Sequence, residues 1–237
     1  MRNKVIQLNI IIFLLIFVNQ SVVFASNNDV IKTNYTSNGK TTKEWCYVID
    51  GKVQYDYNGF AQNENGWWYI ENGKVTFTKN DVIKGTVNGQ TGWWFVKGSK
   101  VQFVDSVEKN INGWWKITNG KVDFTYNGVA KNQYGWWAIK NGKVDFGFTG
   151  LATNKNGTWY CKNSKVQFDY SGKLLYRHIQ QENGNHVTYG DIYTIKNGKY
   201  VSKITYKESE YANKYTYNKS LYWQYIELNP TKVTKKI

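Results

Sequence analysis

The sequence predicts an all-β fold: a solenoid-like array of about six β-hairpin repeats of about 22 residues, followed by a small β-rich C-terminal region. Three observations support this prediction. Of 237 residues, 17% are aromatic and only one is proline, a composition typical of short aromatic strands joined by glycine turns. The phrase Gly-Trp-Trp recurs with its glycine at residues 66, 92, 113 and 135. Each copy is followed by a turn containing glycine or serine and then by Lys-Val-x-Phe.

The N-terminal segment has the pattern of a signal peptide. Arg2 and Lys4 precede an apolar run over residues 10–18, and Val23-Phe24-Ala25 supplies a small-residue cleavage pattern. We therefore expect residues 1–25 to be removed on export, giving a secreted protein with no membrane span after cleavage. Residues 26–43 are rich in Asn, Thr, Ser and Lys, and the sequence predicts a polar linker there.

The repeats are expected to fill residues 44–172. A degenerate first copy begins at Trp45 and a degenerate last copy begins at Gly157, as capping of a stacked array requires. Within a copy, two apolar-aromatic runs flank a turn that is most often Asn-Gly, which is the strongest short hairpin signal. Strand alternation places the second Trp, and the Val and Phe of Lys-Val-x-Phe, in the core. Cys46 and Cys161 fall on the same face, so we expect two buried thiols.

The C-terminal region, residues 173–237, lacks the Gly-Trp-Trp phrase but is still rich in aromatic residues. Residues 191–200 form another predicted hairpin around Asn-Gly, and the Tyr-rich segment 211–228 is a strand candidate. The pattern leaves open whether this region is a separate small β-domain or a continuation of the sheet.

The first Trp of each pair lies on the face opposite the predicted core, where its neighbours vary between copies. A row of Trp on a rigid scaffold offers flat faces for stacking sugar rings, or walls for a quaternary ammonium held by cation–π attraction. A purely structural interpretation also stands, in which both Trp pack between successive hairpins. The candidate ligand-binding residues are Trp45, Trp67, Tyr69, Trp93, Trp114, Tyr126 and Trp136.

The repeated phrase resembles the cell-wall-binding repeats of Gram-positive bacterial surface proteins, the broad group that includes choline-binding and glucan-binding repeats. The resemblance covers residues 44–172. It implies a β-hairpin solenoid that binds wall polymers non-covalently. In choline-binding repeats, aromatic residues from consecutive hairpins surround the choline. The matching candidates are the first Trp of each unit, with Tyr69 or Tyr126 nearby.

Charge and residue types narrow the function. A formal net charge of +14 favours a polyanionic partner such as teichoic acid, beside wall polysaccharide or peptidoglycan. Nucleic acid is not expected, since the lysines stand singly at turns, where they usually serve solvation. His178 and His186 have no recurring catalytic partner, and no metal-ligand spacing occurs. We therefore predict a secreted, cell-wall-associated, non-catalytic binding protein without cofactors. The alternative is a surface adhesin that binds a host glycan or protein, and the sequence does not indicate an oligomeric state.

Overall fold

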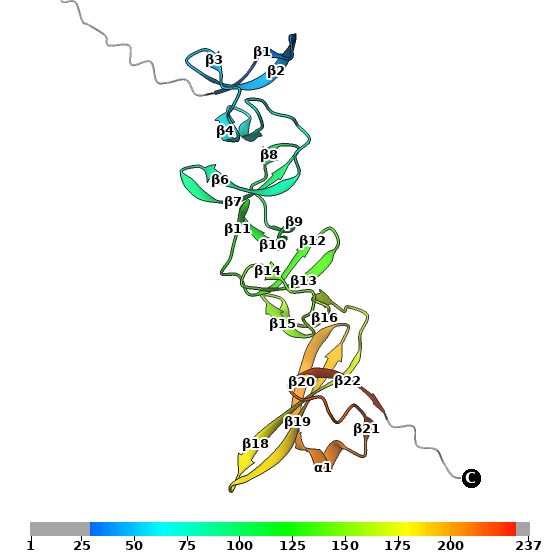
Figure 1. Ribbon diagram of the computed structural model, residues 1–237. Helices are drawn as coiled ribbons and strands as arrows, with labels where there is room; N and C mark the ends of the chain where they lie inside the picture. Colours follow the sequence, from blue (N-terminus) through cyan, green and yellow to red (C-terminus); the bar gives the residue numbers. More distant parts are fainter. Residues whose placement is uncertain (1–28, 231–237) are drawn as a thin grey trace, which may run out of the picture.

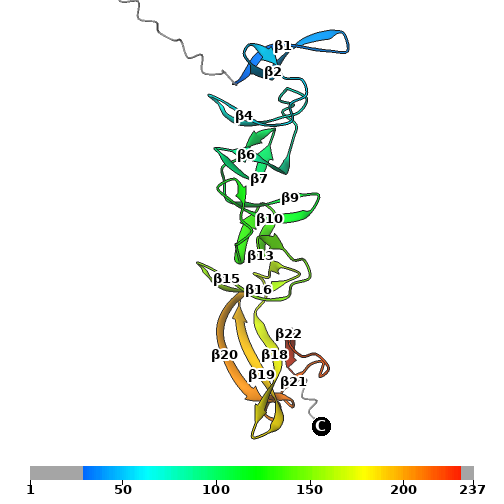
Figure 2. The same ribbon diagram turned by 60° about the vertical axis from the view of Figure 1, so that its left-hand side comes forward.

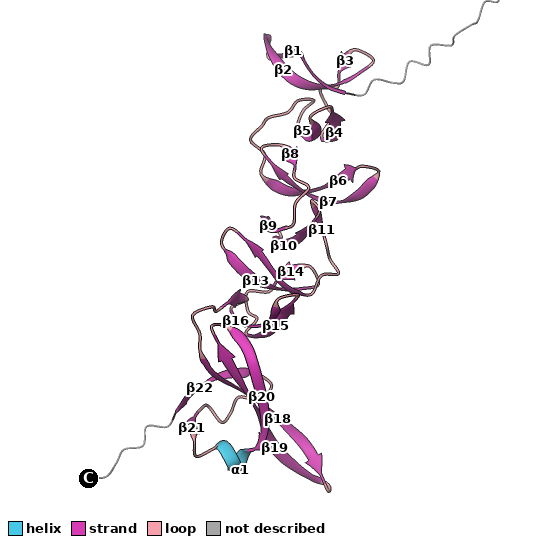
Figure 3. Cartoon of the chain, turned by 180° about the vertical axis from the view of Figure 1, so that it is seen from behind, coloured by secondary structure: helices cyan, strands magenta, loops and turns pink. Residues whose placement is uncertain are grey.

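The computed structural model describes residues 29–230, which form an elongated stack of antiparallel hairpins (Figures 1 and 2). The predicted all-β repeat array is confirmed. Figure 3 shows the single short helix at the far end of the stack, near the C-terminus. The predicted signal peptide lies outside the described residues.

The stack begins with a hairpin that the sequence analysis did not predict. Strands β1 (Asp29–Ser37) and β2 (Lys40–Ile49) pair in antiparallel register, and β3 (Lys52–Val53) follows. The polar linker predicted for residues 26–43 is therefore wrong from Asp29 onward. The segment 36–41 is a Thr-Ser-Asn-Gly-Lys-Thr hairpin turn, and Val30 and Tyr35 supply enough buried apolar surface to anchor the strands.

Five longer hairpins form the array. They are β4 (Gly59–Asn63) with β5 (Gly66–Ile70), β6 (Asp81–Val87) with β7 (Gln90–Lys97), β9 (Ser106–Asn110) with β10 (Gly113–Thr118), β12 (Gly128–Asn132) with β13 (Gly135–Lys140), and β15 (Gly150–Asn154) with β16 (Gly157–Lys162). Four two-residue return strands follow: β8 (Lys100–Val101), β11 (Lys121–Val122), β14 (Lys143–Val144) and β17 (Lys165–Val166). In each repeat, the turn before Gly-Trp-Trp therefore connects the two strands of the longer pair. The Asn-Gly turn that follows connects the second of these strands only to a short return strand.

The return strands are short because a turn begins directly after Lys-Val. In β11 the next residue is Asp123, whose Oδ1 accepts the backbone N–H of Thr125 at 3.0 Å and its hydroxyl at 2.7 Å. A carboxylate that bonds the backbone two residues on closes a turn and ends strand pairing. Asp145 does the same with the N–H of Gly147, at 3.0 Å.

Successive repeats are joined by one recurring backbone bond, the inter-repeat bond. The carbonyl of Gly142, in an Asn-Gly turn, accepts the N–H of Lys116 from the preceding repeat at 2.7 Å. Gly142 has φ +74°, and a Cβ there would lie 2.4 Å from the Asp123 carbonyl oxygen, so this turn accepts only glycine without a shift. Equivalent bonds run from Tyr47 to Gly73, Tyr69 to Ser99, Phe95 to Gly120, Ala138 to Ser164, and Tyr160 to Gly198.

The core consists of small clusters strung along the stack rather than one central core. The valines of Lys-Val-x-Phe are at most 6% exposed, as are the isoleucines at Ile70, Ile117 and Ile139. Cys46 and Cys161 are both buried and free, which confirms the two predicted thiols. Burial raises the pKa of the Cys161 thiol to about 12 and also raises the pKa of Cys46.

The C-terminal region continues the stack. Strands β18 (Gly172–Glu182), β19 (Asn185–Lys196) and β20 (Lys199–Lys207) form a long meander, followed by α1 (Glu208–Tyr211), β21 (Tyr215–Thr216) and β22 (Tyr225–Pro230). The turn before β20 makes the inter-repeat bond to Tyr160, as a further repeat would. The predicted hairpin at 191–200 is confirmed. The predicted strand over 211–228 is wrong for most of its length, because only residues 215–216 and 225–228 pair and Tyr211 ends α1.

Candidate ligand-binding site

Where two successive repeats meet, three aromatic rings lie together. We call each such group an aromatic triad. It contains the first Trp of one repeat, and the second Trp and the Phe of the next. In the clearest case, the Trp114 and Trp137 ring centroids are 5.6 Å apart, and the Phe146 ring stands edge-on to both at 6.1 and 5.7 Å. These distances fall within the range of attractive aromatic pairs.

The triad recurs along the whole array. At the next junction, Trp136 and Trp159 are 6.3 Å apart, with Phe168 edge-on to both. At the three earlier junctions the second Trp and the Phe make the same edge contact, and the first Trp packs against the same apolar cluster as the second. These triads are Trp45/Trp68/Phe77, Trp67/Trp94/Phe103 and Trp93/Trp115/Phe124.

The phenylalanines correct the predicted core. Phe77, Phe103, Phe124, Phe146 and Phe168 are 41–50% exposed, in contrast to the buried valine two residues earlier. Strand alternation assigned the Val and the Phe to one buried face. The chain has already left the strand at the Phe, however, and the Phe ring packs edge-on against the second Trp of the same repeat. The second Trp is half-buried in the triads, except for Trp94.

Hydrogen bonds hold the second Trp in position. The Trp137 indole N–H donates to Asn132 Oδ1 at 2.9 Å, and the Asn132 amide donates to the Val107 carbonyl at 2.8 Å. Trp68, Trp115 and Trp159 are held in the same way by Asn63, Asn110 and Asn154. A satisfied indole N–H fixes the ring orientation and leaves its face available for contacts.

The triad at Trp94 is the exception. Its indole N–H donates to the carbonyl of Gly85, where the other repeats have Asn, and Trp94 is only 4% exposed. A Cβ at Gly85 would lie 2.5 Å from the Phe60 ring, so the absence of a side chain admits that ring. The grooves along the array are therefore not identical.

The first triad opens into a cavity of about 320 Å³. The rings of Trp45, Trp68 and Phe77 line it together with Lys100, and the remaining lining residues are Val30, Asn63, Asn65 and Val75. This volume lies at the lower end of the range for small-molecule sites, about 300–1,000 Å³. Aromatic walls with a few polar groups suit either a sugar ring or a quaternary ammonium.

The five predicted Trp residues each belong to a triad. Trp114 and Trp136 contact the second Trp of the next repeat, and Trp45, Trp67 and Trp93 share an apolar cluster with it. Tyr69 lies elsewhere, edge-on to Phe60 at 5.4 Å within a core cluster. Tyr126 donates its hydroxyl to the Val129 carbonyl at 2.9 Å and packs against the cluster beside the Trp114 triad. The structure thus places Tyr69 and Tyr126 next to the grooves rather than among the three rings.

Beside Tyr126 lies an unusual buried lysine. Lys116 occupies the position of Tyr69 and Phe95 in earlier repeats, and its Nζ lies 5.4 Å from the Tyr126 ring centroid and 4.0 Å from Asp105. Burial lowers the pKa of Lys116, opposed by Asp105 and Asp123. Its ammonium donates to the Ile117 carbonyl, so it is held by the backbone of its own strand.

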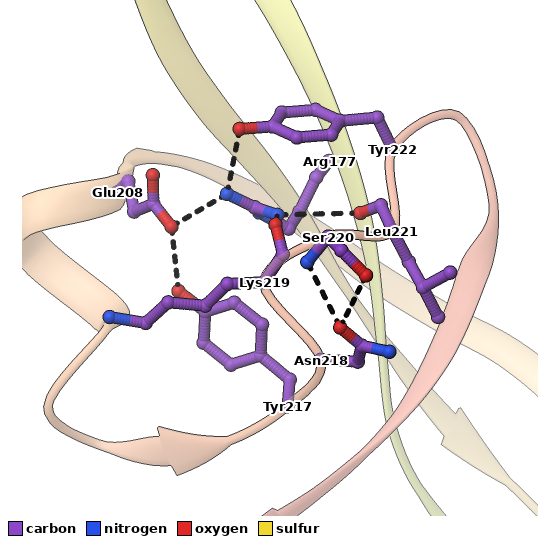
Figure 4. A network of polar contacts seen from close by, with 8 residues as sticks. All are labelled: Arg177, Glu208, Tyr217, Asn218, Lys219, Ser220, Leu221 and Tyr222. Carbon is purple, nitrogen blue, oxygen red and sulfur yellow. Dashed lines mark hydrogen bonds and ion pairs between the residues drawn. The ribbon is translucent and has the colours of Figure 1, made fainter.

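A second polar cluster lies in the C-terminal region and has a structural role (Figure 4). The guanidinium of Arg177, which is 1% exposed, donates to Glu208 at 2.7 Å, to the Tyr222 hydroxyl at 3.1 Å, and to the carbonyls of Lys219 and Leu221. By taking these two carbonyls, Arg177 holds the segment 217–222 as a loop, which explains why the predicted strand there is interrupted.

In the C-terminal region, His178 lies beside the carboxylate of Asp191. Nε2 of His178 lies 3.6 Å from Asp191 Oδ1 and makes no hydrogen bond within the described residues. The Asp191 carboxylate accepts from Thr205 at 2.6 Å and from Lys203 at 3.2 Å. Within residues 29–230, no group of three or more His, Cys, Asp or Glu side chains is arranged to hold a metal ion. No helix in this range has the length and apolar character needed to cross a membrane.

Sequence reasoning identified the first Trp of each pair but assigned its two partners, the second Trp and the Phe, to the core. The recurring Asn five residues before the second Trp was the available signal, since its period matches that of the Trp. The turn lysines were assigned to solvation. In the structure, five of the turn lysines lie over the ring of a second Trp.

Comparison with known proteins supports this geometry. A model of the choline-binding repeat family matches four segments, residues 56–76, 84–102, 125–145 and 147–167. No curated protein matches the chain. Each matched segment contains the second Trp of one triad and ends one residue after the valine of Lys-Val-x-Phe, just before the Phe. The stretch between residues 56 and 167 therefore contains four segments that are similar to choline-binding repeats.

Proposed function

We propose that this protein is exported and attaches non-covalently to cell-wall polymers, with the aromatic triads as its binding sites and without catalytic activity. The observation that carries the proposal is the edge contact of the second Trp with the Phe at five successive repeat junctions, the first of which opens into a ligand-sized cavity. The match to the choline-binding repeat supports a choline group on a wall polymer as the ligand.

The energetics favour multivalent binding. A quaternary ammonium against aromatic faces gains about 0.5–2 kcal/mol per contact, so one groove binds weakly. Several grooves on one rigid stack engage a polymer with many identical groups, and each further contact is intramolecular. Weak single sites and firm attachment to the wall are therefore compatible.

Co-sedimentation of the secreted protein with purified Gram-positive cell walls tests the proposal. The test variant replaces Phe77, Phe146 and Phe168 by alanine, because these rings are 41–47% exposed and their removal leaves the buried clusters intact. The control variant replaces Trp223, which is 59% exposed and lies outside the array. We expect wall binding to fall in the test variant, to persist in the control, and to be displaced by choline. Equal binding by all three proteins would refute the proposal.

The same assay distinguishes the polymer. Walls stripped of teichoic acid should lose binding if the choline groups are carried there. Binding that survives stripping, resists choline and still falls in the Phe variant would instead indicate a wall glycan stacked on the rings.

A further inference from the structure

A row of five lysines runs beside the aromatic triads. Each lysine stands one repeat after the second Trp of a triad, and its Nζ lies 5.1–5.7 Å from the centroid of that Trp ring, within cation–π range. The lysine row comprises Lys100 over Trp68, Lys121 over Trp94, Lys143 over Trp115, Lys165 over Trp137 and Lys199 over Trp159.

Backbone pairing and packing fix these side chains. In each case the lysine pairs, strand to strand, with the Trp over which it lies, for example Lys143 with Trp115. Its stem crosses the glycine that precedes the Trp pair: a Cβ on Gly113 would lie 2.6 Å from the Cε of Lys143. Gly113 also has φ +133°, a backbone conformation that favours glycine. The side chain of a lysine from the next repeat therefore occupies the space beside the Gly of Gly-Trp-Trp.

The charge of the lysine row is not compensated. Within residues 29–230, none of its five ammonium groups has a carboxylate within 4.0 Å. Nearer the N-terminal end of the array, by contrast, Lys74 lies 3.6 Å from Glu44 and Lys79 lies 3.3 Å from Glu71. Each of these Trp rings thus has a lysine ammonium over it with no carboxylate of the described residues within 4.0 Å.

This charge alters what the groove binds. Lys100 lines the same cavity as Trp45, Trp68 and Phe77. A bare quaternary ammonium entering that cavity meets a like charge next to its aromatic partner, and this repulsion opposes the cation–π attraction. A ligand that carries a phosphate beside the group in the groove instead places a negative charge near the ammonium, and lysine binds phosphate as a point charge.

We propose that the lysine row makes each groove select a ligand in which a phosphate adjoins the group held by the aromatic rings. The inference rests on the proposed function, which it refines from choline to the charge of the ligand's linkage. The shared chemistry is the phosphate, whether it is attached to choline or to a sugar. Lys100, Lys121, Lys143, Lys165 and Lys199 act as specificity-determining residues.

Isothermal titration with matched ligand pairs tests this inference: choline against phosphocholine, and N-acetylglucosamine against its 6-phosphate, with inorganic phosphate alone as reference. The test variant changes all five lysines of the row to glutamine. The control variant changes five exposed lysines that lie over no ring and have no carboxylate partner, and so removes the same net charge. These are Lys84, Lys97, Lys109, Lys140 and Lys155.

For the native protein we expect the phosphorylated ligand to bind about 5-fold more tightly than its partner at low salt, the upper range of an exposed ion pair. The preference should disappear in the test variant and persist in the control. If the five-site variant fails to fold, Lys143→Gln with Lys165→Gln, both exposed, repeats the test with a matched control of Lys140→Gln with Lys155→Gln.

The outcomes separate the two proposals. Equal binding of choline and phosphocholine by the native protein, or equal loss of preference in both variants, would overturn the role of the lysine row and leave the proposed function standing. A preference seen only in the sugar pair would assign the phosphate to a glycan. Failure of every ligand to bind, together with failure of the native protein to co-sediment with cell walls, would refute both proposals.

Discussion

Replacing Gly142 by alanine tests the inter-repeat bond, on which the whole stack depends. Gly142 has φ +74°, and an added Cβ would lie 2.4 Å from the Asp123 carbonyl oxygen and 2.7 Å from Phe124 Cα. A left-handed alanine costs about 1–2 kcal/mol, and forcing an extra carbon against backbone adds about 1–3 kcal/mol. The expected loss in free energy of unfolding is about 2–5 kcal/mol, the sum of these two costs.

Gly89 provides the matched control. It also follows Asn in a hairpin turn, with φ +70°, but a Cβ there meets nothing within 4 Å. Gly89→Ala should therefore lose only the backbone cost of about 1–2 kcal/mol. Urea unfolding followed by Trp fluorescence, with Tm from calorimetry, measures the difference, at about 2–4 °C for each kcal/mol in a chain of this size. Equal destabilisation by the two substitutions would refute the close packing of the Asn-Gly turns.

Three further predictions follow from the described contacts. Asn132→Ala removes the hydrogen bonds to the Trp137 indole and to a buried carbonyl, and should lower the free energy of unfolding by about 1–3 kcal/mol without changing the far-UV spectrum. The hydrogen bond from the Thr125 hydroxyl holds the pKa of Asp123 below its usual value. The ionised carboxylate therefore stabilises the fold above about pH 4, its unfolded pKa, and loses that contribution as the pH falls through the folded pKa. Thr125→Val should accordingly lower Tm at neutral pH, with the difference vanishing near about pH 2. Because burial raises the pKa of both cysteine thiols, neither should react with Ellman's reagent at pH 8 until urea unfolds the chain, and fast reaction of the folded protein would contradict their burial.

The sequence was sufficient to predict whatever depends on neighbours within one repeat. The period of Gly-Trp-Trp predicted the array, and the Asn-Gly turns predicted where the chain reverses. The buried valines followed from alternation over two residues. Alternation failed at the Phe, for example Phe146, because the carboxylate of Asp145 closes a turn one residue earlier and the ring leaves the strand face.

Contacts between repeats were beyond local pattern reading. A turn lysine such as Lys165 directly follows the polar residues Asn163 and Ser164, which is typical of a solvated side chain. Its actual partners, Gly135 and Trp137, belong to the preceding repeat. The N-terminal hairpin was missed for a similar reason, since Val30 finds its buried apolar partners only when the next repeat stacks beneath it.

Because each groove draws on three successive repeats, ligand binding and stacking are one coupled equilibrium. The groove at Trp68 needs Trp45 from one repeat, Phe77 from the next and Lys100 from the third. A chain that has lost any of these junctions has lost the groove, so ligand binds the stacked state and not the frayed one. At a ligand concentration ten times Kd, each occupied groove then adds about 1.4 kcal/mol to the stacked state. The thermal midpoint should therefore rise with ligand in steps set by the number of open grooves, and a ligand that binds measurably yet leaves the midpoint unchanged would mean that the rings bind it from a single repeat.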